Sequence, residues 1–162
     1  MIFLRRYSWI IITLSFLFAF ILQSMPWPSN LNMLRPSWVQ LILIYWVTVT
    51  PHRVNVGIGF LIGLILDLFL GSTLGIRALT YGLLSFVCVL IHKFMRNIAL
   101  WQQIFFILIL SLAVEVFIYW LSFIVSTVEY HPELFFRSIV NALLWPWLYF
   151  LMNRIKNHFK VH

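Results

Sequence analysis

The chain has 162 residues, of which 63% are hydrophobic and only 9% are charged, whereas soluble domains carry roughly 25% charged residues. A chain of this length cannot bury so much apolar surface and still cover itself with polar side chains, so lipid must solvate most of it and a soluble fold is excluded. The net charge of +7 comes from basic residues clustered between apolar runs, which is typical of membrane-protein loops and argues against a nucleic-acid partner.

Six apolar runs are interpreted as membrane helices, each of which needs about 20 apolar residues. The first run ends before Pro26 because proline cannot continue the helical hydrogen-bond ladder, and Pro146 predicts a kink inside the last. The expected fold is an all-α polytopic membrane bundle of six transmembrane helices, forming one integral-membrane domain over residues 1–162. In chain order, the predicted helices cover residues 8–24, 38–50, 54–70, 78–91, 100–128 and 134–152.

The second run, residues 38–50, is short for a transmembrane helix. It is either a full span or a re-entrant segment, and the second alternative leaves five spans. None of the runs alternates as the strands of a membrane barrel do. Arg5 and Arg6 precede the first run as in a signal peptide, but no small-residue cleavage site follows. We therefore expect the first helix to be retained.

The distribution of basic residues predicts the orientation of the bundle. With the amino terminus inside, eight of the eleven Lys and Arg residues fall on the inner side. The positive-inside rule then places both termini in the cytoplasm. The inner set is Arg5, Arg6, Arg53, Lys93, Arg96, Arg154, Lys156 and Lys160, and the outer set is Arg35, Arg77 and Arg137.

Glu115 lies near the middle of the fifth predicted helix, where a charge is costly and is a functional candidate. Ser111, Glu115, Tyr119, Ser122 and Ser126 follow one another at spacings of three or four, which places them on one helix face. We expect this face to point into the bundle. Glu115 is either an ion, proton or partner site, or a protonated carboxyl group that bonds to a neighbouring helix. No intramembrane Lys or Arg is expected opposite it.

Asp67 lies about one turn from the outer end of the third predicted helix, and Arg77 follows the glycine-containing turn on the same side. A structural ion pair that fixes the turn is the favoured interpretation, with a binding surface as the alternative. Gly59 and Gly63 form a GxxxG element, which lets another helix backbone approach closely. We expect this element to serve packing within the chain rather than dimerisation.

The sequence contains none of the common patterns of catalytic or metal-binding residues. No GxSxG, HExxH, Walker-type or dinucleotide-binding pattern is present. The five histidines lie at predicted helix ends or in loops, and none has a partner at metal-ligand spacing. Cys88 is the only cysteine and sits in an apolar run. We expect no enzymatic activity, metal or cofactor.

Several short motifs, taken together and in order, resemble the proteobacterial MreD family of rod shape-determining proteins. They are MPWP at 25–28, RPSWV at 35–39, PHRVNVG at 51–57, LDL at 66–68, GSTLGIR at 71–77, RNIALWQQ at 96–103 and LWPW at 144–147. Their loop residues are candidates for contacts: Pro26, Trp27, Arg35, Pro51, His52 and Arg53.

This resemblance implies an inner-membrane member of the cell-elongation complex, together with MreC, MreB, RodA and a penicillin-binding transpeptidase. It also implies a fold similar to the substrate-binding subunits of energy-coupling-factor transporters. The expected function is a non-enzymatic scaffold that binds MreC, is surrounded by membrane lipid, and supports side-wall peptidoglycan synthesis and rod shape. The alternative is a small-molecule or lipid-binding transporter subunit. A binding subunit should enclose a polar pocket, whereas a scaffold should present its polar residues to a partner.

Overall fold

The structure, a computed structural model, describes residues 2–125, 133–159 and 161. Within this part of the chain the fold is entirely helical, which confirms the predicted fold class. The elements are α1 (Ile2–Ser24), the short 3-10 helix η1 (Ser29–Leu34), α2 (Trp38–Val49), α3 (Val56–Leu70), α4 (Ile76–Asn97), α5 (Leu100–Val125) and α6 (Glu133–His158).

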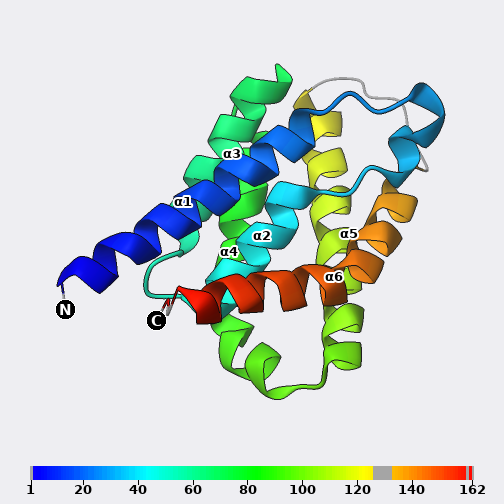
Figure 1. The fold of residues 1–162 in the computed structure, drawn as a ribbon. Helices are drawn as coiled ribbons and strands as arrows, with labels where there is room; N and C mark the ends of the chain where they lie inside the picture. Colours follow the sequence, from blue (N-terminus) through cyan, green and yellow to red (C-terminus); the bar gives the residue numbers. More distant parts are fainter. Residues whose placement is uncertain (1, 126–132, 160, 162) are drawn as a thin grey trace.

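The helices form two groups that cross at a steep angle (Figure 1). α3, α4 and α5 stand upright, whereas α1 and α6 run across them, and the two termini lie on the same side of the molecule. α3 packs along α4, and α5 of the upright group contacts α6 of the other group. α2 contacts α1, α4 and α6, so it joins the two groups.

α2 is the centre of the bundle. Every residue from Val39 to Thr48 is buried, and the helix is about 18 Å long, against about 30 Å for the hydrocarbon core of a bilayer. A short helix at membrane depth is tolerated because protein, not lipid, surrounds its ends. The run that was ambiguous in the sequence is therefore an internal helix of the bundle.

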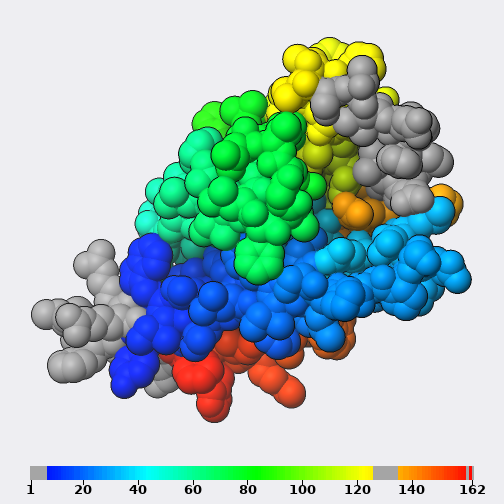
Figure 2. Space-filling view, turned by 90° about the horizontal axis from the view of Figure 1, so that it is seen from above, coloured from blue at the N-terminus to red at the C-terminus, as the bar shows by residue number. Residues whose placement is uncertain are grey.

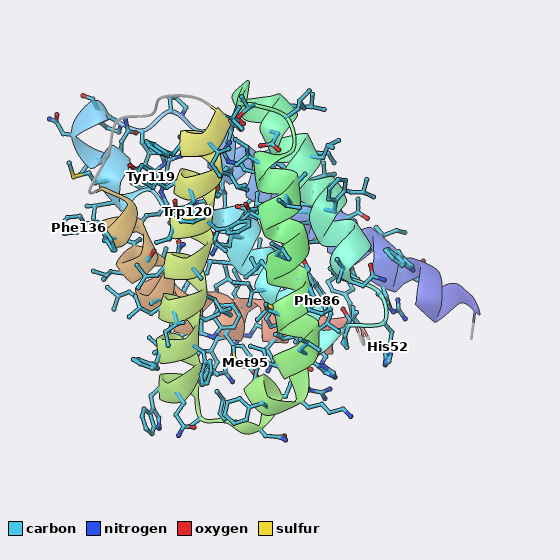
Figure 3. All side chains as sticks on the ribbon, turned by 180° about the vertical axis from the view of Figure 1, so that it is seen from behind. His52, Phe86, Met95, Tyr119, Trp120 and Phe136 are labelled. Carbon is cyan, nitrogen blue, oxygen red and sulfur yellow. The ribbon has the colours of Figure 1, made fainter. Side chains whose placement is uncertain are left out.

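In the described part of the chain, four helices are long and apolar enough to cross a membrane: α1, α4, α5 and α6. α3 is also apolar but shorter. Large apolar side chains cover the outside of the bundle, including Phe86 on α4, Trp120 on α5 and Phe136 on α6 (Figure 3). Lipid is the solvent that suits such a surface, since soluble proteins rarely expose large apolar patches.

Three helices extend beyond their predicted ends, since hydropathy falls at the first charged residues although the helical backbone continues. α1 begins at Ile2, α4 continues to Asn97 and α6 to His158. Basic residues favour helix carboxyl ends because they complement the helix dipole, and Arg96 and Lys156 occupy the last turns of α4 and α6. α5 is described as far as Val125, and the residues predicted to follow it, 126–128, lie outside the described part. Pro146 lies inside α6, and its kink stays a prediction.

Candidate functional site

Asp67 caps the amino terminus of α4 from the neighbouring helix α3. Its carboxylate accepts hydrogen bonds from the backbone N–H groups of Gly75 (2.9 Å), Arg77 (3.1 Å) and Ala78 (3.2 Å). The first N–H groups of a helix have no partner within it, and Gly75, the residue before α4, has no side chain to cap them. A carboxylate is well suited to this position because the helix dipole is positive there.

Arg77 completes the site as the ion-pair partner expected from the sequence. Its Nη1 lies 3.6 Å from Asp67 Oδ1 and donates to Ser72 Oγ at 2.6 Å, and Ser72 Oγ in turn bonds Asp67 Oδ1 at 3.1 Å. The backbone donors lie closer to the carboxylate than the guanidinium does. Because Asp67 has no exposed surface, it joins α3 to α4 and offers nothing for a partner to contact.

The glycines of the GxxxG element pack α3 directly against α4. A Cβ atom on Gly63 would lie 2.7 Å from Ala78 Cα and would also meet the carbonyl oxygen of Arg77. A Cβ atom on Gly59 would lie 2.8 Å from Tyr81 O and would also meet Ser85. These distances are shorter than van der Waals contact. The element is therefore used inside the chain, beneath the turn that Asp67 holds.

Glu115 has a charged partner, which the sequence analysis did not expect. Arg137 Nη1 lies 3.6 Å from Glu115 Oε1, and the Glu115 side chain is 6% exposed against 33% for Arg137. Arg137 lies in the first turns of α6, within the helix that the sequence predicts, and α6 contacts α5. The Glu115 carboxylate is thus held in an ion pair within the chain.

A buried network of uncharged polar groups links three helices. Ser111 on α5 accepts hydrogen bonds from Gln40 on α2 (3.2 Å) and from Asn141 on α6 (3.4 Å). Asn141 Oδ1 in turn accepts from the backbone N–H of Ser37 at 2.9 Å. Of the predicted α5 face, Ser111 and Glu115 are buried, and Tyr119 and Ser122 are half-buried. Ser126 lies outside the described residues.

A second buried contact fastens the α4–α5 turn to α6. Gln103 donates to the carbonyl oxygens of Met95 (3.0 Å) and Ile98 (3.4 Å) and accepts from the Trp145 indole at 3.1 Å. Sequence reasoning missed Gln103, Gln40 and Asn141 because it considered mainly charged residues. The available signal was simpler, since each is an amide within or beside an apolar run.

The burial of the Glu115–Arg137 ion pair predicts that replacing its two members lowers the stability of the protein by unequal amounts. Arg137→Gln should lower the free energy of unfolding by about 1–3 kcal/mol because it leaves a buried carboxylate without its counter-charge. Glu115→Gln should lower the free energy of unfolding by less, since water and headgroups can solvate the partly exposed arginine. The double variant should be more stable than Arg137→Gln alone, as measured by thermal unfolding in mild detergent. Additive losses would show that the two side chains are not coupled.

The loop candidates fall into two groups at opposite ends of α2. Pro26 is exposed and Trp27 is half-buried before η1, and Arg35 is half-buried after it. Burial and the positive charge of Arg137 lower the pKa of Arg35.

The other group forms the turn between α2 and α3. Pro51 and Arg53 are half-buried there, and His52 is exposed (Figure 3). The backbone N–H groups of Arg53 and Val54 both donate to Thr50 O at 3.0 Å, which closes the turn. The structure therefore does not bring the two groups together. Among the described residues, no three His, Cys, Asp or Glu side chains are placed to hold a metal ion.

Comparison with known proteins agrees with the motifs. A family model described as rod shape-determining protein MreD matches residues 4–155. The rod shape-determining protein MreD of Haemophilus influenzae is 35% identical over 155 residues, which cover 96% of each chain. No solved structure matches, so the likeness to energy-coupling-factor subunits stays a prediction. Since both matches span nearly the whole chain and four helices suit a bilayer, the chain belongs to the MreD family of membrane proteins, which is involved in rod shape determination.

Proposed function

We propose that the protein is a non-enzymatic scaffold of the cell-elongation complex in the bacterial inner membrane. It binds MreC and supports side-wall peptidoglycan synthesis by the complex that also contains MreB, RodA and a penicillin-binding transpeptidase. Family membership over residues 4–155 supports the role in cell shape. The partner and the biosynthetic role are inferred from the family resemblance.

Family membership carries the scaffold proposal, and the use of the intramembrane polar groups indicates where a partner can bind. Asp67 binds the amino terminus of α4, Glu115 pairs with Arg137, and Ser111 binds Gln40 and Asn141. These groups hold helices to one another, and the described helices present mainly apolar side chains outward. Contrary to our expectation for a scaffold, the polar residues are not offered to a partner. We therefore infer that MreC contacts the apolar faces and the exposed loops.

A transporter-type binding subunit, the alternative function, would need a polar cavity for its substrate. Ligand pockets usually measure about 300–1,000 Å³. Among the described residues, a polar cavity between helices lies near the carboxyl ends of α4 and α6, beside Gln103, Arg96 and Lys156, and measures about 180 Å³. A second cavity between α4 and α5 measures about 170 Å³ and has an apolar lining, including Leu84 and Val114. The larger hollow between α1 and α6 is apolar, and the polar surface beside it is an open face of α6. None of these is an enclosed polar pocket, so none favours the alternative.

Co-purification tests the proposal directly. MreC produced together with the tagged protein should be recovered with it from mild detergent, and cells depleted of the protein should become round. Pro26→Ala and His52→Ala alter exposed loops at the two ends of α2 without touching the core. We expect at least one of them to lower recovery of MreC while the protein remains monodisperse. Normal rod shape after depletion, or no recovery of MreC with the wild-type protein, would refute the proposal.

Topology provides a separate prediction. Both termini lie on one side of the molecule (Figure 1), which supports the cytoplasmic placement of both ends that the basic residues predict. Reporter fusions after Arg35 should therefore indicate the periplasm, and fusions in the α4–α5 turn at Ile98 should indicate the cytoplasm. Fusions near Glu129 should likewise indicate the periplasm and fusions after Lys160 the cytoplasm; both sites lie outside the described residues. A periplasmic carboxyl terminus would contradict this topology.

A further inference from the structure

An apolar groove runs between α1 and α6. Its volume is about 560 Å³, and α2 forms its floor with Trp38 and Ile42. The walls are apolar side chains of α1 and α6, including Leu14 and Met152. Figure 2 shows the end of α6 in red beside α1 in dark blue. Ser15, a polar residue in the lining, already binds the Trp46 indole at 2.8 Å, so the groove offers almost no free polar group.

The groove borders a polar patch near the carboxyl end of α6. Trp147 and Leu151 belong to both the groove and the patch, which also includes Arg154, Asn157 and His158. All residues of the patch lie on α6, so it is an open surface of one helix, and no Asp or Glu is among them. Arg154 supplies a fixed positive charge, and the asparagine and histidine side chains supply hydrogen-bond donors. The apolar groove therefore continues into a cationic, hydrogen-bonding patch on α6.

We propose that this continuous surface binds one anionic phospholipid. An acyl chain lies in the groove between α1 and α6, and the phosphate group lies beside Arg154 and His158. Basic residues next to transmembrane helices attract anionic headgroups. The charge complementarity selects a lipid over a partner's transmembrane helix, because the middle of such a helix has an apolar surface and no anionic group for the cationic patch. The lipid would fill the gap between two helices that otherwise meet mainly through α2.

Native mass spectrometry of the full chain, purified and supplied with defined lipids, tests this proposal. Phosphatidylglycerol should be retained in preference to phosphatidylethanolamine. Arg154→Gln should lower the affinity for phosphatidylglycerol about fivefold, since one basic residue near an anionic surface contributes about 1 kcal/mol. Lys93→Gln removes an exposed charge from α4, outside the patch and the groove, and should leave the affinity unchanged. Equal retention of the two lipids, or equal losses in the two variants, would overturn the proposal.

The groove itself is tested with a second pair of variants. Leu14→Trp enlarges a side chain in the groove and should reduce lipid retention. Leu17→Trp enlarges one on the same helix that is also exposed but does not line the groove, and it should have no effect. Both positions are solvent-accessible, so both variants should remain folded, as judged by size-exclusion chromatography. Unchanged lipid retention with loss of MreC recovery in Leu14→Trp would assign the groove to a protein helix instead.

Discussion

Replacing Asp67 with alanine should lower the melting temperature of the detergent-solubilised protein by about 10 °C. The change removes the acceptor for three backbone N–H groups at the start of α4. A buried donor without a partner costs about 1–3 kcal/mol, and each kcal/mol corresponds to about 2–4 °C for a chain of this length. The melting temperature can be followed by size-exclusion of heated samples of a fluorescent-protein fusion.

Neighbouring variants make this prediction specific. Asp67→Asn keeps one acceptor oxygen but places the NH₂ group of an amide among N–H donors. Its melting temperature should therefore fall nearly as far as that of Asp67→Ala. Arg77→Gln should lower the melting temperature clearly less, because the backbone donors still hold the carboxylate. The double variant Asp67→Asn/Arg77→Gln should be little worse than Asp67→Asn alone. A larger loss in Arg77→Gln would show that the ion pair, not the cap, fixes the turn.

Gly63→Leu should prevent most of the protein from accumulating in a folded form, although leucine suits lipid better than glycine does. Even a Cβ atom at this position would lie 2.7 Å from Ala78 Cα, and backbone atoms cannot move aside as a flexible side chain can. α3 and α4 would have to separate, and Asp67 would then lose the helix that it caps. The folded fraction can be measured as monodisperse fusion fluorescence after mild extraction.

Gly82 supplies the matched control on the opposite helix. A Cβ atom there would lie 3.6 Å from Phe60 Cβ, which is ordinary contact. Gly82→Ala should therefore be neutral or slightly stabilising, since alanine favours a helix interior over glycine by about 1 kcal/mol. Gly63→Ala should already be destabilising. Equal behaviour of Gly63→Ala and Gly82→Ala would contradict the close packing of α3 on α4.

The class of the protein and the number of its helices follow from the sequence by itself. The free energy of transferring apolar side chains from water to lipid is a sum over residues. It can therefore be calculated along the chain without knowing which residues are neighbours in space. The special positions Gly63, Asp67 and Arg77 were also identified, since they lie close together in the sequence around one turn. The helix ends were placed less well, because the fall in hydropathy near Lys93 and Arg154 precedes the end of the helical backbone.

Only the tertiary structure decided which helix is central and which polar groups meet. α2 is buried by α1, α4 and α6, and hydropathy does not distinguish burial in protein from burial in lipid. The pairs Glu115–Arg137 and Gln40–Ser111 join residues on different helices. Such pairs depend on the rotation and crossing of the helices, which side-chain packing sets. The groove between α1 and α6 likewise exists only because α2 holds these two helices apart.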